Sequence, residues 1–165
     1  MQRVSFREMN CSVAQALEVV GEWWSLLIVR DALLGVTRFD EFHHRLGISR
    51  NVLNERLGRL VDEGVLDKVA YQDHPPRYDY VLTEKGRDLW DVLDAMRRWG
   101  DRWAPPAEGP PMQLVHRSCG HHTTPSLRCS ECDEPLTQRD VTLVYGPGAD
   151  DRSPSLPGRT SPDGS

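Results

Sequence analysis

The chain has 165 residues, of which 38% are hydrophobic and 27% are charged, and its formal net charge is -5. These values are typical of a globular protein with room for one ordinary domain and an appendage, and the acidic balance gives no indication of nucleic-acid binding. No apolar run approaches the roughly 18 residues of a membrane-spanning helix, so we expect no membrane partner. The first residues lack a secretory signal, which predicts a cytoplasmic location.

Composition divides the chain into four segments. Residues 1–104 alternate between helix and turn signals, and residues 105–113 form a Pro-rich linker. Residues 114–148 hold a Cys/His cluster, and residues 149–165 are rich in Ser, Pro and Gly, which predicts a disordered tail. We therefore expect one main domain followed by a small extension.

The first two predicted helices are separated by a glycine. Ser12 and Gln15 have the spacing of a capping box, which predicts a helix that continues to Val20 and ends at Gly21. The apolar run that follows predicts a second, mostly buried helix that Gly35 stops.

The third and fourth predicted helices are joined by a tight turn at Gly47. Phe39, Phe42 and Leu46 recur at helical spacing in a short third helix. Ser49 is a good N-cap for the fourth helix, whose apolar face consists of Val52, Leu53, Leu57, Leu60 and Val61. This arrangement predicts a helix-turn-helix.

A β-hairpin and a long helix are expected after it. The stretches "LDKVAY" and "RYDYVLT" have strand character and are separated by the turn-rich "QDHPP", which predicts a wing. A helix then begins at Thr83, with an apolar stripe of Leu89, Val92, Leu93, Met96, Trp99 and Trp103. The stripe favours packing on another helix. The predicted fold is mainly α with a small β-hairpin wing (α+β), a winged helix-turn-helix, plus a small zinc-ribbon-like segment.

Residues Cys11 to Trp103 resemble the HxlR-type winged-helix transcription regulators, relatives of the MarR group. The resemblance rests on "ALEVVGEWWSLLIVRDALLGVTRFDEF", "GISRNVLNERLGRLVDEGVL", "PPRYDYVLTEKG" and the closing "RRWGDRW", in this order. It implies a homodimer formed through the N- and C-terminal helices, with one recognition helix per protomer on a double-stranded DNA operator. Ser12 departs from the family, whose members often have Pro at this position.

The candidate DNA-binding residues follow from the helix that starts at Ser49. The residues expected to reach base edges in the major groove are Arg50, Asn51, Asn54 and Glu55. Arg suits guanine and Asn suits adenine, because each can make bidentate contacts. Ser49 and Arg38 are better placed for phosphates, and Arg77 lies at the expected wing tip. Arg56 falls beside the apolar face and favours a structural cation.

The Cys/His segment "HRSCGHHTTPSLRCSEC" predicts a metal site. His116 with Cys119, and Cys129 with Cys132, each have two residues between the ligands, a spacing at which both side chains can bind one tetrahedral ion. Four such ligands predict one structural zinc ion per chain.

Alternatives to this ligand set remain open. His121 or His122 could replace His116. Free thiols, a disulfide or a redox switch compete with zinc. Gly120 follows the first pair where a metal-binding turn often needs a positive φ, whereas Asp133 holds the corresponding position after the second pair and tolerates it less well.

Cys11 is a candidate redox sensor. In some relatives a cysteine near the start of the first helix senses oxidants, and a helix N-terminus stabilises a thiolate. The competing interpretation is an inert, buried thiol, because no second cysteine lies nearby in the sequence.

The predicted function is a sequence-specific DNA-binding transcriptional regulator, most simply a repressor, acting as a homodimer on a near-palindromic operator. The arginines between residues 38 and 59 outnumber the carboxylates there, which permits a basic face on an acidic chain. The overall acidity favours the rival hypothesis, a metal- or redox-responsive protein-interaction module that has lost DNA binding. An enzyme is not expected, because the chain has no nucleophile-base pair, phosphate loop or open metal site. A small-molecule or redox effector is left open, and the sequence does not identify it.

Overall fold

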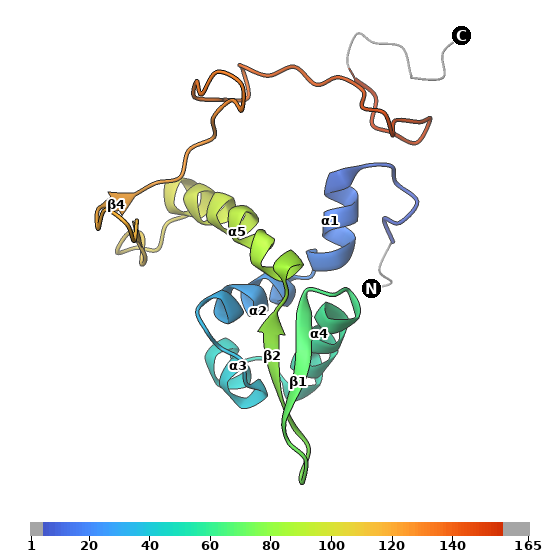
Figure 1. The fold of residues 1–165 in the computed structure, drawn as a ribbon, viewed down its shortest axis with the longest axis vertical. Helices are drawn as coiled ribbons and strands as arrows, with labels where there is room; N and C mark the ends of the chain where they lie inside the picture. The colour runs from blue at the N-terminus through green and yellow to red at the C-terminus, as the bar shows by residue number, and fades with distance from the viewer. Residues whose placement is uncertain (1–4, 157–165) are drawn as a thin grey trace. The chain divides into compact units, whose positions relative to one another are not determined.

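The computed structural model describes residues 5–156, which divide into two compact units between Leu93 and Asp94. The elements of the first unit are α1 (Ser12–Val20), α2 (Trp23–Leu33), α3 (Phe39–Leu46), α4 (Arg50–Asp62), β1 (Leu66–Gln72) and β2 (Arg77–Leu82) (Figure 1). The long helix α5 (Glu84–Trp103) runs from the first unit into the second, which also holds the short strands β3 (Leu114–Val115) and β4 (His122–Thr123). The winged helix-turn-helix fold is confirmed.

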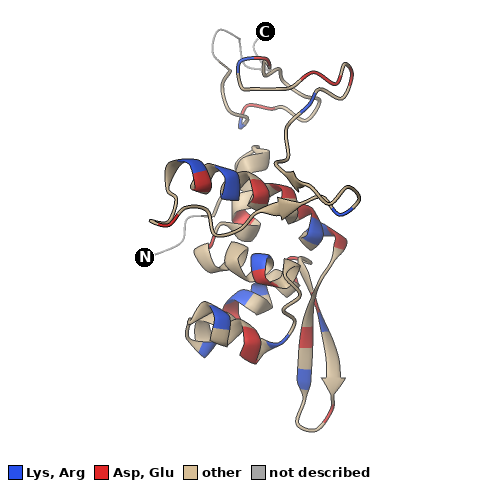
Figure 2. Cartoon of the chain, turned by 90° about the vertical axis from the view of Figure 1, so that its left-hand side faces the viewer, with Lys and Arg blue, Asp and Glu red and all other residues tan. Residues whose placement is uncertain are grey.

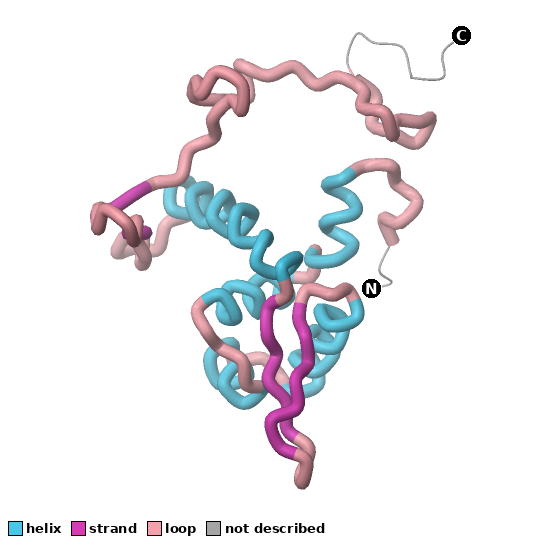
Figure 3. The backbone as a smooth tube through the Cα atoms, viewed as in Figure 1, coloured by secondary structure: helices cyan, strands magenta, loops and turns pink. Residues whose placement is uncertain are grey.

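Loop dominates the chain after α5, in contrast to the helical first unit (Figure 3). The only strands there within the described part are the two residues each of β3 and β4, which pair antiparallel. The predicted disordered tail covers residues 149–165. Of these, residues 157–165 lie outside the described residues. In its described part, the Asp150 carboxylate accepts a hydrogen bond from the Arg152 backbone N–H, 3.0 Å away.

Three predicted helix boundaries are confirmed: the end of α2 before Gly35, the end of α3 at Gly47 and the start of α4 after Ser49. Ser49 caps α4, because its Oγ accepts a hydrogen bond from the Val52 backbone N–H at 3.3 Å. Gly35 and Gly47 have φ values of 95° and 65°, a left-handed conformation in which a side chain would be strained. The two helices of the helix-turn-helix are therefore separated by the turn that the sequence indicates.

The capping box predicted for α1 is wrong, although the bounds of the helix are correct. Cys11 is the N-cap and makes no side-chain capping bond, so Ser12 already lies inside the helix. The Gln15 amide instead donates hydrogen bonds to carbonyls of the preceding segment, at 2.8 Å for Met9 and 3.2 Å for Phe6. The Gln15 side chain thus points back to the segment before the helix, and local sequence rules do not predict this contact.

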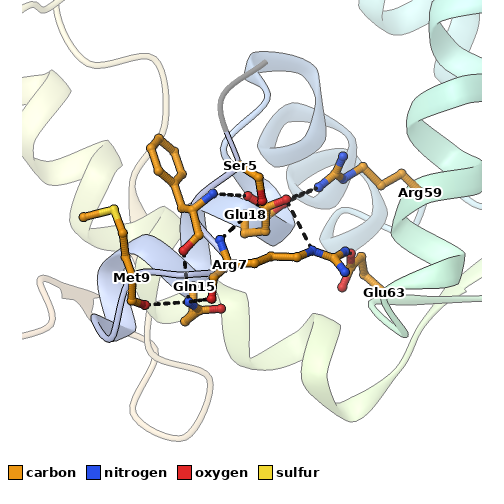
Figure 4. Close-up of polar contacts among 8 residues, drawn as sticks. Ser5, Arg7, Met9, Gln15, Glu18, Arg59 and Glu63 are labelled. Atoms are coloured by element: carbon orange, nitrogen blue, oxygen red, sulfur yellow. Dashed lines mark hydrogen bonds and ion pairs between the residues drawn. The ribbon is translucent and has the colours of Figure 1, made fainter. Parts of the chain in front are cut away.

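The segment before α1 is fastened to α1 and α4 by a buried carboxylate (Figure 4). Glu18 is 8% exposed and accepts a hydrogen bond from the Phe6 backbone N–H at 2.9 Å. Its Oε1 lies 3.7 Å from Arg7 Nε and 3.5 Å from Arg59 Nη2. Arg7 also lies 3.6 Å from Glu63, so ion pairs tie residues 5–9 to the C-terminal end of α4.

The hydrophobic core lies among α2, α3, α4 and the base of the hairpin. Its fully buried large side chains include Ile28, Phe42, Leu53, Leu57 and Leu60. The predicted apolar face of α4 is therefore confirmed, with Val52 and Val61 partly buried at its margins. Burial of each such side chain contributes about 1.5–3 kcal/mol.

The wing is an antiparallel hairpin whose base is fixed to the helical part. Leu66 pairs with Leu82 at the base, and a register shift between Ala70 and Gln72 precedes the turn. The Tyr80 N–H donates to the Thr37 carbonyl at 2.8 Å, just before α3 begins. This bond fixes the wing next to the start of α3, and the hairpin extends beyond the helices (Figure 1).

Gly86 is held against the wing and supports a prediction. A Cβ atom there would lie 2.2 Å from the Val65 carbonyl oxygen and 2.8 Å from Leu82 Cδ2. Because a backbone oxygen cannot move cheaply, Gly86→Ala should lower the free energy of unfolding by about 1–3 kcal/mol. Chemical denaturation measures this change.

Gly58 is the matched control for that substitution. A Cβ atom at Gly58, in the middle of α4, meets nothing within 4 Å. Gly58→Ala should therefore raise the free energy of unfolding by about 0.5–1 kcal/mol, because Ala restricts the unfolded chain more than Gly does. Equal effects of the two substitutions would contradict the close packing at Gly86.

Within residues 5–156, no single helix is long and apolar enough to cross a membrane. Among the described helices, only α1 and α2 together have the length and apolar composition of a membrane span, and the chain bends by 78° between them. Both helices contribute buried side chains to the hydrophobic core, Val20 and Ile28 among them.

Candidate nucleic-acid interface

The start of α4 presents polar side chains to solvent on the side opposite the core. Asn51, Asn54 and Glu55 are exposed, whereas Leu53 and Leu57 between and after them are fully buried. The helical period of 3.6 residues produces this division, because the buried positions fix the rotation of the helix. The predicted base-reading positions are therefore all accessible.

Arg50 is exposed but already has partners. Its Nη2 donates to Asp40 Oδ1 at 2.8 Å, and its guanidinium lies 4.9 Å from the centre of the Phe39 ring. The two charged side chains are 61% and 77% exposed, so the ion pair contributes about 0–1 kcal/mol. An exposed pair of this strength can exchange its carboxylate for a stronger acceptor.

Arg38 connects the N-terminus of α3 with the wing. Its guanidinium lies 4.6 Å from the centre of the Tyr71 ring on β1, and its Nε lies 3.7 Å from Asp79 on β2. The side chain is nevertheless 62% exposed, so the cation is accessible to a phosphate. Sequence reasoning identified the arginine but missed Tyr71, because the contact joins residues far apart in the chain.

The wing carries two further cations. Arg77 is exposed and opens β2 opposite Gln72, at the tip as predicted. Lys68, which sequence reasoning did not single out, lies on β1 with its Nζ 4.2 Å from the centre of the Tyr78 ring. The presence of a cation and a tyrosine in each predicted strand, Lys68 with Tyr71 and Arg77 with Tyr78, is the signal that could have found it.

Arg56 and Ser49 have structural roles in α4. The Arg56 guanidinium is only 16% exposed and lies 3.4 Å from Glu22 and from Glu55, which confirms the predicted structural cation. Ser49 caps the helix but remains exposed, so the N-terminus of α4 is open to solvent. A helix N-terminus favours an approaching anion.

Charges of both signs lie on the helices and on the hairpin (Figure 2). Asp40 and Glu41 lie in the first turn of α3, and Asp40 pairs with Arg50. The acidic groups reduce nonspecific attraction to a polyanion, so recognition depends on the placement of individual cations and amides.

The four predicted metal ligands form two separate pairs. His116 Nδ1 lies 3.3 Å from Cys119 Sγ. Hydrogen bonds from the backbone N–H groups of Cys132 and Glu131, together with the Cys132 side chain, lower the pKa of Cys129. No group of three or more His, Cys, Asp or Glu side chains arranged to hold a metal occurs in the described residues, so zinc stays a prediction.

Cys11 lies at the N-cap of α1 and is partly buried. Its backbone is extended, with φ -146° and ψ 119°. The thiol therefore has the position at a helix N-terminus that the sequence predicts, while its role in redox sensing stays a prediction.

A recognition helix with its polar face exposed, a preceding helix and a wing that carries cations define a winged helix-turn-helix DNA-binding protein. Residues 19–108 match the HxlR-like helix-turn-helix family. The chain belongs to this family of transcriptional regulators, which confirms the resemblance found in the sequence.

Relatives and solved structures are similar over most of the chain. Rv3095 of Mycobacterium tuberculosis, an uncharacterized HTH-type transcriptional regulator, is 48% identical over 145 residues, which cover 88% of this chain and 92% of that protein. The crystal structure of PA1607, a candidate transcription factor, matches with a TM-score of 0.76 at 36% identity and covers 87% of this chain and 100% of that one. The reduced form of the transcriptional regulator YodB from B. subtilis matches with a TM-score of 0.51 at 31% identity, over 60% of this chain and 99% of that one.

Two conclusions follow from these similarities. The protein is a DNA-binding transcriptional regulator rather than an enzyme, and membership of this family favours the predicted function over the rival interpretation as a module without DNA binding. The alignment with Rv3095 is also too long to leave out the Cys/His segment, so that segment lies within the similarity.

Proposed function

We propose that the protein is a homodimeric repressor that binds a near-palindromic operator in the cytoplasm, with one α4 helix in the major groove of each half-site. The observation that carries the proposal is the exposed polar face at the start of α4, together with the exposed cations Arg38, before α3, and Arg77, at the wing tip. Amides and a guanidinium at these positions suit base edges, and the flanking cations suit phosphates. A dimer bound across a promoter blocks access to it, which is the simplest way for a chain of this size to regulate transcription.

Exposed apolar side chains on two helices support the dimer. On α5, Met96, Trp99 and Trp103 are 52%, 64% and 63% exposed. They follow one another at intervals of three and four residues and so form a stripe along the helix. On α1, Val13 and Leu17 are exposed at the same helical interval. Apolar stripes of this kind mark surfaces that a partner covers.

Two-fold symmetry sets the geometry of the operator. A symmetric dimer presents two copies of α4, so the half-sites are related by the same two-fold axis and read as an inverted repeat. Recognition helices in successive major grooves on one side of the duplex lie about 34 Å apart, one helical turn. We therefore expect a protected site of two half-sites spaced by about 10 base pairs.

The test separates base contacts from phosphate contacts. Asn51→Ala should weaken binding to the cognate operator by about 1–3 kcal/mol and relax the preference at one base pair, because the adenine edge loses a bidentate partner. Arg77→Ala should weaken binding to all sequences and reduce the slope of log K against log salt by about one. Fluorescence anisotropy on the operator and on a scrambled duplex, over a range of salt concentrations, measures both effects.

The operator for this experiment comes from footprinting on the DNA upstream of the protein's own gene or from selection out of a random library. Each variant is the control for the other, since one predicts a sequence-dependent loss and the other a uniform one. Unchanged operator binding in both variants would contradict the proposed role of α4 and the wing.

A further inference from the structure

The His116–Cys119 pair lies in a tight turn between β3 and β4. The His116 N–H donates to the His121 carbonyl at 2.9 Å, and the His116 carbonyl accepts from the Gly120 N–H at 2.8 Å. The strands on either side pair Val115 with His122. The first ligand of the pair thus bonds through its N–H to the residue five positions on, and through its carbonyl to the residue four positions on.

The Cys129–Cys132 pair lies in a turn with the same pattern. The Cys129 N–H donates to the Glu134 carbonyl at 2.9 Å, and the Cys129 carbonyl accepts from the Asp133 N–H at 3.0 Å. A β-bridge between Arg128 and Pro135 closes this turn, as the strand pairing closes the first. In hydrogen-bond register, His116 and Cys129 are therefore equivalent, and so are Cys119 and Cys132.

Both turns also share a left-handed residue directly after the second ligand. Gly120 has φ 72°, and Asp133 has φ 59°. Asp133 is the only non-Gly residue with a positive φ in the described chain, a conformation that costs an L-residue about 1–2 kcal/mol. Arg128 lies 3.1 Å from the Asp133 carboxylate and helps to hold it. The two turns therefore have the same left-handed residue at the same position, although this conformation is unfavourable for Asp133 in the second turn.

Each turn brings its two side chains together. His116 Nδ1 and Cys119 Sγ are 3.3 Å apart, and the Cys129 sulfur has a hydrogen bond with the Cys132 side chain, besides those from the backbone N–H groups of Cys132 and Glu131. Two ligands that share one side of a tight turn can occupy two corners of a tetrahedron around a single ion.

The segment that holds the turns has no hydrophobic core of its own. No residue between 114 and 148 is buried, and Leu127 and Leu143 are 69% and 74% exposed. A segment of this size needs a metal, disulfides or a partner to become stable, because it removes too little apolar surface from water. All four cysteines of the chain are free thiols.

We propose that the two turns close on one zinc ion, held by His116, Cys119, Cys129 and Cys132. The matching hydrogen-bond register selects His116 over the other two candidates, because His121 supplies the carbonyl that closes the turn and His122 lies on β4. Three thiolates and one imidazole suit zinc, and four protein ligands leave no open position for water. The ion is structural, and its binding energy is the folding energy of the extension.

Elemental analysis of the full chain, prepared without chelator, tests the site. We expect about one equivalent of zinc per chain, which should fall below about a tenth in Cys129→Ser and in His116→Ala. His122→Ala is the matched control and should keep the metal. Less than a tenth of an equivalent of any metal in the unmutated protein would overturn the site, and retention in His116→Ala with loss in His122→Ala would overturn the choice of histidine.

Hydrogen exchange on the chelator-treated protein tests the structural role. Residues 114–145 should lose protection, while α2, α3, α4 and the wing keep theirs, because the core of the first unit has no metal ligand among its described members. Unchanged protection of 114–145 after complete removal of zinc would contradict the proposal, and so would a chain mass lower by two hydrogens, which indicates a disulfide.

Discussion

Leu53→Ala is expected to lower the free energy of unfolding by about 2–5 kcal/mol, since the substitution removes a fully buried side chain and leaves a cavity under the recognition helix. Leu53 is on the inner face of α4, between Asn51 and Asn54 on the outer face. A loss of this size is a large share of the stability of a small domain. Thermal or denaturant unfolding measures it.

Asn54→Ala is the matched control, one residue away on the exposed face of α4. It should change the free energy of unfolding by less than about 0.5 kcal/mol and weaken operator binding by about 1–3 kcal/mol. The two neighbours therefore separate stability from recognition. A stable Leu53→Ala protein, or an Asn54→Ala protein that unfolds easily, would contradict the orientation of α4.

Trp99→Glu in α5 is expected to convert the proposed dimer into a monomer at micromolar concentration. A tryptophan at the centre of an interface typically contributes about 2–4 kcal/mol, and the substitution also buries a carboxylate without a partner. Because a monomer contacts only one half-site, operator binding should weaken with the loss of the dimer. Light scattering and sedimentation measure the assembly.

Leu34→Glu provides the control for this substitution. Leu34 is 53% exposed, close to the 64% of Trp99, but it lies after α2, outside the exposed stripes of α1 and α5. The variant should stay dimeric. A stable monomer in the unmutated protein, or equal dissociation of both variants, would exclude the proposed interface.

The sequence predicts most of the fold because local signals determine it. The glycines at 35 and 47 and the cap at Ser49 mark helix ends through backbone preferences that need no tertiary partner. The capping box at Ser12 failed because Gln15 found carbonyl acceptors in the segment before the helix. A pattern rule cannot see such a competitor, which folding brings to the side chain.

The same distinction applies to the candidate site. The exposed face of α4 follows from helical periodicity, and the sequence therefore predicts that Asn51 and Asn54 are accessible. The partners of Arg38, which are Tyr71 and Asp79, come from the wing and become visible only in three dimensions. The ligand spacing alone does not show that His116 is equivalent to Cys129. That equivalence follows from the backbone hydrogen bonds of the two turns, which only the structure shows.

The ion pair between Arg50 and Asp40 has a consequence for how the protein discriminates between DNA sites. If Arg50 reads a base, that base must first displace a carboxylate that already accepts a hydrogen bond from the guanidinium. A guanine offers two acceptors in the plane of the guanidinium, so its contact with Arg50 offsets the loss of the ion pair. A base with a single acceptor offsets this loss only in part. If Arg50 reads a base, Asp40 is therefore a competitor for the guanidinium, and only a base that offers a stronger acceptor arrangement gains from the exchange. An acidic residue beside α4 would then prevent Arg50 from adding affinity at sites where the base is a weak acceptor.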